Sequence, residues 1–336
     1  MKQDIQKLLD EFASRADSRL TVFDIQIKGI EDGSLALGGR LLEEAQLTTV
    51  REALALRFPG LRLDTASIKI LGSRVAPLMH TATNLTGLYE KPTFETPLAS
   101  ELTYGTPLEA LDEDDRWVFT RQADGYLGWA YRTYLAEGSA PEASHLVLAP
   151  SVELHAEPDE NSAIVTRLVS GTHVAVEKVD GMWLFVVANK SGWLLSKWLR
   201  AIQDLPHSIE GRRAVMLEDS ARMIGVPYLW GGMSGNGIDC SGFARLLHRW
   251  IGVEIPRDAD MQHSAAKPVE PPFEIGDLFF FGEGESDRHI THIGVSLGGW
   301  RMIHSSRRRN GVYIDNIQEV ESLRQIYVSA GSFLRE

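Results

Sequence analysis

The chain has 336 residues, and its 46 acidic residues against 34 basic ones give a net charge of −12. This length predicts two or three domains, and an apolar fraction of 43% is that of an ordinary globular protein. The negative charge argues against nucleic acid or an anionic membrane as the main partner, whereas small peptides remain open as partners.

The start of the chain and its cysteine content bear on the compartment. Residues 1–7 lack the apolar stretch of a signal peptide, and no run approaches the ~18 apolar residues of a membrane span. Cys240 is the only cysteine, which excludes an internal disulfide framework. We therefore expect a cytoplasmic protein with no membrane partner, or an exported one if the sequence lacks its leader.

Residues 1–78 have the pattern of a small α+β domain. Apolar residues recur at helical spacing in two segments and at strand-like intervals in three others. The segments are a helix with Ile5, Leu8, Leu9 and Phe12, a strand at 21–28, a strand at 34–37 joined to it by Asp32-Gly33, a helix with Leu47, Val50, Leu54 and Leu56, and a strand at 67–71. No residue here suggests chemistry, so we expect a packing or spacer role.

An internal repeat follows. Three markers recur 66 positions later and a fourth recurs 64 positions later, because the first copy has two extra residues. The markers are Pro92 and Pro158, Gly105 and Gly171, Trp117 and Trp183, and Gly128-Trp129 and Gly192-Trp193. A repeat of this length predicts two like units, and short strands between glycine and proline turns indicate small β-barrels.

The repeated pattern resembles the bacterial SH3-like domain. The resemblance implies two such domains, at residues 79–138 and 139–203, which bind cell-wall peptides or pack against a catalytic domain. The copies differ, since the first gains Tyr126 and has Glu101 where the second has Arg167. These two residues favour a binding patch in the first copy; the alternative is a solvated glutamate and a tyrosine at the barrel rim.

Residues 204–336 read as one α+β domain, with helices followed by an antiparallel sheet. The predicted elements are a helix with Ala214, Leu217, Ala221 and Ile224, a helix from Cys240, a short helix after Pro256, and strands at 277–281, 292–297, 300–305 and 312–317.

Cys240 stands at the start of a predicted helix, behind a glycine-rich run. Asp239 is a good N-cap, and the residues after the cysteine have helical apolar spacing. The partial positive charge of a helix N-terminus favours thiolate over thiol, so Cys240 is a candidate nucleophile. The alternative is a buried small hydrophobe, the usual fate of a lone cysteine.

Ten histidines compete for the role of base. Strand alternation places Thr291, Ile293, Val295 and Leu297 on an apolar core face and His292 on the opposite face, while His289 falls at the surface. The next strand carries His304, and neighbouring antiparallel strands bring side chains of one face into contact. We therefore expect His292 to be the base and His304 to fix its tautomer, with backbone amides at the helix start forming an oxyanion site.

A zinc site is the main rival for these three residues, because one thiolate and two imidazoles can bind zinc. A cysteine at a helix start suits nucleophilic attack better. We therefore expect no metal and no cofactor.

Several motifs together resemble the NlpC-type papain-like cysteine peptidases of bacteria. They are Pro227-Tyr228-x-Trp230-Gly231-Gly232, Asp239-Cys240-Ser241-Gly242-Phe243, Pro256-Arg257, Gly276-Asp277-Leu278, His292-Ile293-Gly294-Val295 and Ile303-His304. The resemblance implies a papain-like fold with Cys240 as nucleophile, His292 as base and His304 as orienting residue. It also implies Tyr228, Asp239 and Ser241 as substrate-binding positions, and peptidoglycan stem peptides as substrates.

Two SH3-like domains before such a peptidase resemble the layout of the γ-D-glutamyl-L-diamino-acid endopeptidases (dipeptidyl-peptidase VI). In that layout the first SH3-like domain closes one end of the cleft. The resemblance implies that Tyr126, Asp258 and Glu101, or Glu90 in place of Glu101, bind the free amine of an N-terminal L-alanine. Residues 1–78 have no counterpart in that layout.

These observations predict an endopeptidase that hydrolyses the γ-D-glutamyl–diamino-acid bond of small murein peptides and releases L-Ala-γ-D-Glu. A non-catalytic cell-wall peptide-binding protein and an amidase or acyl transferase with the same thiol remain alternatives. The sequence leaves open diaminopimelate against lysine, hydrolysis against transfer, and the oligomeric state.

Overall fold

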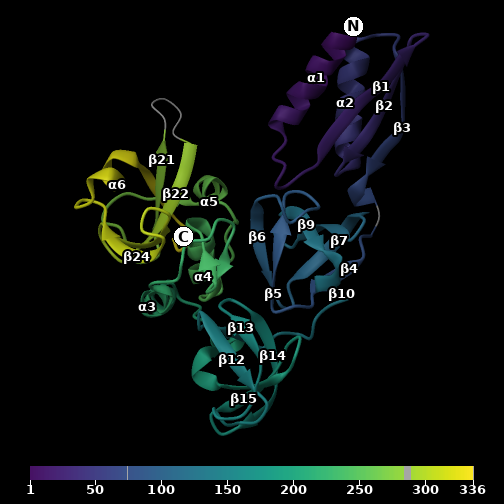
Figure 1. Ribbon diagram of the computed structural model, residues 1–336. Coiled ribbons are helices and arrows are strands. Elements are labelled where there is room, and N and C mark those ends of the chain that lie inside the picture. Colours follow the sequence, from purple (N-terminus) through teal and green to yellow (C-terminus); the bar gives the residue numbers. More distant parts are fainter. Residues whose placement is uncertain (74, 284–288, 336) are drawn as a thin grey trace.

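The computed structural model describes residues 1–73, 75–283 and 289–335. Its elements form four groups in chain order: an N-terminal α+β domain, two β units and a C-terminal α+β domain. The N-terminal domain stands on the first β unit, the C-terminal domain lies beside that unit, and the second β unit lies below both (Figure 1). Within the described part of the chain, no helix has the length and apolar character needed to cross a membrane.

The N-terminal domain packs two helices on a three-stranded sheet. Its elements are α1 (Lys2–Arg15), β1 (Phe23–Glu31), β2 (Ser34–Leu41), α2 (Glu44–Arg57) and β3 (Arg62–Ile70). Strands β1 and β2 are antiparallel and meet at a turn with positive φ at Asp32 and Gly33, whereas β2 and β3 are parallel. The expected elements are present, but Leu56 is 87% exposed, because the buried stripe of α2 is Leu47, Val50 and Leu54.

The two β units have the same strand order. The first contains β4 (Leu78–Thr81), β5 (Leu85–Tyr89), β6 (Leu98–Thr103), β7 (Pro107–Asp114), β8 (Trp117–Gln122), β9 (Leu127–Tyr131) and β10 (Leu135–Glu137), in the order β10-β4-β7-β8-β9-β5-β6. The second contains β11 (His145–Val147), β12 (Ser151–His155), β13 (Ile164–Val169), β14 (His173–Asp180), β15 (Trp183–Val187), β16 (Gly192–Leu195) and β17 (Leu199–Ala201), in the equivalent order β17-β11-β14-β15-β16-β12-β13. Gly105 and Gly171 hold the same turn at φ of 78° and 75°, a conformation that favours glycine.

The C-terminal domain packs helix α4 (Cys240–Arg249) against a six-stranded sheet. The sheet order is β20-β25-β21-β22-β23-β24, and apolar side chains of α4 such as Phe243 and Leu247 bury against Ile293 and Ile303. The other elements are α3 (Ile209–Ser220), β18 (Met233–Ser234), β19 (Gly237–Ile238), α5 (Ala259–Ala265), β20 (Lys267–Pro268), β21 (Leu278–Glu283), β22 (His289–Ser296), β23 (Arg301–Ser306), β24 (Gly311–Asn316), α6 (Glu321–Ile326) and β25 (Tyr327–Ser332).

The predicted apolar face of the helix at 214–224 is wrong, and α3 itself ends at Ser220, followed by a 3-10 turn at Ala221–Met223. Leu217 and Ile224 are 43% and 49% exposed, whereas Met216 and Met223 are buried in the core. The buried face is shifted by one residue, because it also carries the carboxylate of Asp219, which pairs with Arg200 at 2.7 Å. An acidic residue on a buried helix face is not visible in an apolar pattern.

Strand β22 departs from simple alternation at one residue. Phe281 pairs with His292 and Gly282 pairs with Ile290, so Thr291 is the extra residue of a β-bulge. The bulge places Ile290 in the core and leaves Thr291 exposed, contrary to the expected core position of Thr291. Beyond the bulge the prediction holds, since Ile293 and Val295 are buried in the core and His289 is exposed.

Both β units support helix α4. At its C-terminal end, Trp250 Nε1 donates to Val147 O of the second unit at 3.0 Å, and Arg200 Nη1 donates to Trp250 O at 3.0 Å. On the side of the first unit, Arg245 Nη2 bonds Asp124 Oδ2 at 2.6 Å. The helix that begins at the cysteine is therefore fixed by residues from outside its own domain.

Candidate active site

Cys240 is the first residue of α4. Asp239 caps the helix, and its Oδ1 accepts the backbone N–H of Gly242 at 2.6 Å. The thiol is 8% exposed and receives hydrogen bonds from the backbone amides of Ile293 and Ser241. Because Ile293 follows His292 on β22, these contacts bring the helix start and the expected base strand together.

The resting thiol is neutral. Burial, followed by the nearby carboxylate of Asp239, raises the pKa of Cys240 to about 12. The two backbone amides oppose this shift but do not cancel it. The expectation that the helix start favours thiolate is therefore wrong for the resting state, because desolvation of the charged sulfur outweighs the partial charge of the helix end.

The two predicted histidines form a hydrogen-bonded pair. His292 Nε2 lies 2.7 Å from His304 Nδ1, and the ring centroids are 4.9 Å apart. Burial, and then the neighbouring His304, lowers the pKa of His292 to about 3. His292 is therefore a neutral imidazole, which is able to accept a proton.

Asp315 on β24 extends this pair into a line of three side chains. His304 Nε2 lies 2.9 Å from Asp315 Oδ2, and Arg309 Nη1 donates to Asp315 Oδ1 at 2.6 Å. The hydrogen bond with His304 is the largest cause that lowers the pKa of Asp315, so the carboxylate is ionised and only accepts.

The ionised carboxylate sets the tautomer of both rings. His304 donates from Nε2 to Asp315, so its Nδ1 accepts the N–H of His292 Nε2. The remaining nitrogen of His292, Nδ1, then has a free lone pair for the thiol proton. Asp315 lies in a strand predicted from the sequence, but its role was not predictable, because the strand register that pairs Met302 with Asp315 is not readable from the sequence.

An ion pair lies behind the nucleophile. Arg257 is 1% exposed; its Nη2 donates to Asp239 Oδ2 at 2.7 Å, its Nη1 to Ser241 Oγ at 3.0 Å and its Nε to Ser100 Oγ at 3.1 Å. Asp239 also accepts from the backbone amide of Gly231 at 2.9 Å. The side chains of Asp239 and Ser241 thus hold the helix start, and their contact with substrate stays a prediction. In the sequence, Arg257 stood out only as part of the Pro256-Arg257 motif, without a role.

Tyr228 lies close to the nucleophile. Burial is the largest cause that raises the pKa of the Tyr228 phenol, and the nearby carboxylate of Asp239 adds to it. The hydroxyl therefore stays protonated and is able to donate a hydrogen bond near the sulfur.

The structure brings together Tyr126 and Asp258, which are 132 positions apart. Tyr126 O–H donates to Asp258 Oδ2 at 3.0 Å. Glu101 Oε2 accepts the backbone amide of Met233 at 2.8 Å, and burial raises the pKa of its carboxyl group. Glu90 is exposed, so Glu101 is the better candidate of the two. An aromatic hydroxyl and two carboxyl groups thus border the same side of the C-terminal domain.

Residues 225–330 match the NlpC/P60 family, and residues 88–133 match the bacterial dipeptidyl-peptidase SH3 domain. The chain thus carries an NlpC/P60 cysteine peptidase domain. The match includes Cys240, His292, His304 and Asp315, so the hydrogen-bonded line of side chains lies inside the NlpC/P60 domain.

Two curated relatives are similar over most of their own length. The chain is 28% identical over 234 residues to the γ-D-glutamyl-L-lysine dipeptidyl-peptidase of Bacillus subtilis, covering 66% of this chain and 77% of that protein. It is 27% identical over 258 residues to dipeptidyl-peptidase 6 of Lysinibacillus sphaericus, covering 71% and 91%. The fold is similar to that of an NlpC/P60 family protein from Bacillus cereus, with a TM-score of 0.68, 21% identity and coverage of 77% of this chain and 100% of that one.

The zinc alternative finds no support in the geometry. The two imidazoles hydrogen-bond each other, which occupies one nitrogen of each ring. Among residues 1–73, 75–283 and 289–335, no group of three or more His, Cys, Asp or Glu side chains is arranged to hold a metal ion.

The N-terminal domain reaches the NlpC/P60 domain through Arg19, which sequence analysis missed. Arg19 lies between α1 and β1, and its Nη1 donates to Asp258 Oδ2 at 2.9 Å. The same carboxylate oxygen accepts from Tyr126. Residues 1–78 therefore contact the NlpC/P60 domain directly. No sequence signal marked Arg19, because it is a single charged residue in a short loop with no motif around it.

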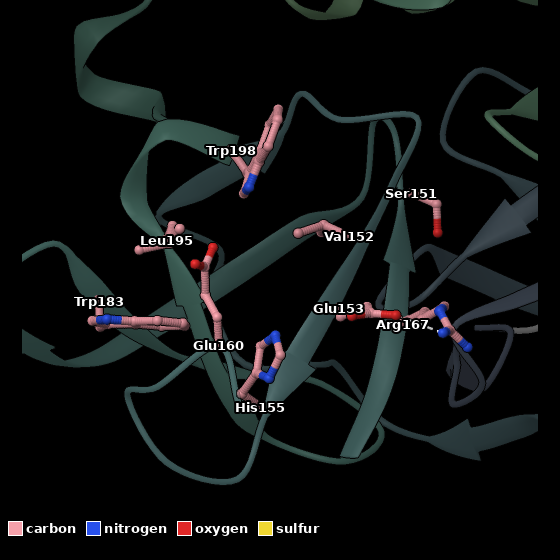
Figure 2. Close-up of a pocket in the computed structure, with 9 residues that line it drawn as sticks. All are labelled: Ser151, Val152, Glu153, His155, Glu160, Arg167, Trp183, Leu195 and Trp198. Carbon is pink, nitrogen blue, oxygen red and sulfur yellow. Dashed lines mark hydrogen bonds and ion pairs between the residues drawn. The ribbon is translucent and has the colours of Figure 1, made fainter. Parts of the chain in front are cut away.

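A hollow of about 330 Å³ opens on the second β unit, away from the NlpC/P60 cysteine. Figure 2 shows Trp183, Trp198, Leu195 and His155 around it, with the Glu160 side chain extending toward Leu195. At the repeat position of Glu160 the first unit has Phe94, whose ring lies 4.7 Å from that of Trp117. In the first β unit, Phe94 thus packs on Trp117 at the position that borders the hollow in the second β unit.

A second hollow, of about 640 Å³, borders His304 and Asp315. It also contacts Arg308, Arg309 and α6. It does not include Cys240, so it lies behind the line of three side chains rather than in front of the sulfur.

Proposed function

We propose that the protein is an endopeptidase that hydrolyses the γ-D-glutamyl–diamino-acid bond of peptidoglycan-derived peptides with a free N-terminal L-alanine and releases L-Ala-γ-D-Glu. The observation that carries this proposal is the pairing of Tyr126 with Asp258 beside the nucleophile helix. The names of the similar γ-D-glutamyl-L-lysine dipeptidyl-peptidases support it.

Acylation begins with transfer of the Cys240 proton to His292 Nδ1 as the sulfur attacks the γ-glutamyl carbonyl carbon. A neutral thiol and a neutral imidazole suit this concerted step, because no buried ion pair precedes it. Asp315 and His304 stabilise the imidazolium that forms. Backbone N–H groups at the start of α4 and the Tyr228 hydroxyl are the donors available to the developing oxyanion.

The leaving amine takes its proton from His292 as the C–N bond breaks, which leaves the dipeptide acyl group on Cys240 Sγ. Water then attacks the thioester and gives a proton to His292 Nδ1. Collapse of the resulting tetrahedral intermediate breaks the C–S bond and releases the dipeptide γ-carboxylic acid, which loses its proton to solvent, while the His292 proton returns to the sulfur. Hydrolysis requires only water to resolve the thioester.

Recognition of the free amine follows from charge. An ammonium group forms charge-assisted hydrogen bonds with carboxylates. The two candidate acidic groups are Asp258, which accepts from Tyr126, and Glu101, which accepts from Met233. An N-acetylated peptide brings no positive charge, so the acidic groups would be desolvated without a partner. The enzyme would therefore cleave after the second residue from a free N-terminus.

As part of the same proposal, the enzyme recycles small murein peptides in the cytoplasm. The net charge of −12 supports small soluble fragments over an anionic polymer surface, because like charges repel.

The experiment compares L-Ala-γ-D-Glu-meso-diaminopimelate, its L-lysine analogue and the N-acetylated forms by mass spectrometry. We expect release of L-Ala-γ-D-Glu from the free-amine peptides, little cleavage of the acetylated ones, and none with Cys240→Ala. Equal cleavage of free and acetylated peptides would remove the proposed specificity, and no cleavage of any would remove the proposed reaction.

A further inference from the structure

Arg19 uses all five of its N–H donors. Nε and Nη2 donate to the two oxygens of Asp17 at 2.9 and 2.7 Å, and Nη1 and Nη2 donate to the two oxygens of Asp260 at 2.8 and 2.6 Å. The remaining Nη1 donor bonds Asp258 Oδ2 at 2.9 Å. A guanidinium held by two bidentate carboxylates has one orientation, so its contact with Asp258 is fixed by the contacts on either side.

The loop that carries Arg19 is anchored beside Tyr126. The backbone amide of Leu127 donates to Arg19 O at 2.8 Å, and the backbone amide of Arg19 donates to Asp17 Oδ1 at 3.0 Å. Leu127 follows Tyr126 in the chain, so this backbone hydrogen bond holds Arg19 and Tyr126, the two residues whose side chains bond Asp258, next to each other. One belongs to the N-terminal domain and the other to the first β unit.

Both donors bind the same oxygen of Asp258. Tyr126 and Arg19 occupy Oδ2, while Oδ1 has Arg257 Nη1 at 3.9 Å, which is beyond hydrogen-bonding distance. The carboxylate is thus oriented from two domains through Oδ2. Oδ1 accepts no hydrogen bond from the described residues and is the oxygen open to an ammonium.

The cluster stays negative after Arg19 is included. One guanidinium faces the carboxylates of Asp17, Asp258 and Asp260, so the four groups together carry a charge of about −2 when all are ionised. Arg19 relieves the repulsion between Asp258 and Asp260 without removing the attraction for a cation.

We propose that Arg19 is a positioning residue for the amine subsite, so that the N-terminal domain takes part in substrate recognition by orienting Asp258. This inference rests on the proposed function. The opposite arrangement, in which Arg19 occupies the place of the substrate amine and competes with it, predicts an opposite change in KM.

The test uses the full chain and the free and N-acetylated forms of L-Ala-γ-D-Glu-diaminopimelate. Arg19→Ala removes one of two donors on Asp258 Oδ2, and we expect KM for the free-amine peptide to rise about tenfold, in line with loss of one charge-assisted hydrogen bond. We expect kcat to stay within about twofold and cleavage of the acetylated peptide to be unchanged. Arg19→Lys keeps the positive charge but loses the planar, forked donor set of the guanidinium. Its KM should therefore lie between those of the wild type and Arg19→Ala.

Lys69→Ala is the matched control. Lys69 Nζ bonds Asp112 Oδ1 at 2.5 Å and also ties the N-terminal domain to the first β unit, but it does not contact Asp258. We expect its KM to equal that of the wild type. Circular dichroism melts of all three variants check that each is folded.

Three results would overturn the inference: an unchanged KM for Arg19→Ala, a lower KM, or an equal rise with Lys69→Ala. The wild-type enzyme separates this failure from failure of the proposed function. If the wild type prefers the free amine and Arg19→Ala keeps that preference, only the role of Arg19 is wrong. If the wild type shows no preference, the proposed function is wrong, and the inference fails with it.

Discussion

Replacement of Asp315 by asparagine tests the proton line behind the nucleophile. The variant keeps the size of the side chain but removes the negative charge that accepts the hydrogen bond from His304 Nε2 at 2.9 Å. The asparagine amide is able to turn its NH₂ group toward His304, which would place the His304 proton on Nδ1. His292 would then accept at Nε2 and carry its own proton on Nδ1, where it is useless as a base.

The size of the effect follows from one charge-assisted hydrogen bond. Asp315 is 14% exposed, so the bond is little weakened by water. Such bonds contribute about 1.5–3 kcal/mol. Their loss would lower the population of the His292 tautomer with an unprotonated Nδ1 by roughly 10- to 150-fold. We expect kcat to fall by this factor and KM to change less than about threefold, because Asp315 lies two side chains from the sulfur.

The assay is steady-state hydrolysis of the free-amine peptide at neutral pH. Arg309→Gln is the control, since it removes the other partner of Asp315, at 2.6 Å from Oδ1, while the carboxylate and its bond to His304 remain. Its kcat should stay within about threefold of wild type. If Asp315→Asn retains full kcat, or if the loss appears in KM alone, the tautomer argument fails.

The pKa of Asp315 is lowered by the hydrogen bond with His304, so the stability that this bond contributes is present above the ordinary Asp range and is lost as pH falls through the lowered pKa; urea midpoints of Asp315→Asn and wild type should converge at low pH, and a constant difference would contradict this. Burial raises the pKa of Cys240 to about 12, so alkylation of the free enzyme by iodoacetamide should be slow at pH 7 and still rise above pH ~9, and a plateau below pH ~8 would show an activated thiolate instead. Tyr126→Phe loses the bond to Asp258 Oδ2 and should raise KM for the free-amine peptide several-fold while the acetylated peptide is unaffected; equal kinetics would exclude Tyr126 from the site. Gly171→Ala adds a Cβ at 2.7 Å from Leu246 Cδ1 and at φ +75°, so thermal or urea unfolding should show a loss of about 1–2 kcal/mol, whereas the same change at Gly138, also at positive φ but with nothing within 4 Å, isolates the backbone part.

The local features of the site were predictable from the sequence. The N-cap at Asp239 and the apolar stripe after Cys240 lie within a dozen residues, and the offsets of the repeat are read by comparison of the chain with itself. Alternation in a strand placed His292 opposite the core, and the pair with His304 required only two consecutive strands. Such signals depend on spacing along the chain, which a sequence displays directly.

Features that depend on the meeting of distant segments were not predictable. The partnership of Arg19 with Asp258 depends on how the N-terminal domain docks, and that of Asp315 with His304 depends on strand register. The neutral state of the Cys240 thiol depends on burial by several elements at once. The position at a helix start alone predicts a lowered pKa for this thiol, whereas burial raises it. The bulge at Thr291 inserts one extra residue into β22. Strict alternation of core and surface positions does not reveal where such an extra residue lies.

The contact between Arg19 and Asp258 also sets an order of events during synthesis. It spans 239 positions, and that between Tyr126 and Asp258 spans 132. The N-terminal domain and both β units leave the ribosome before Asp258 does, and domains generally fold as units from the N-terminus. Closing such long loops is slow relative to local folding, so the proposed amine subsite is among the last parts of the protein to form.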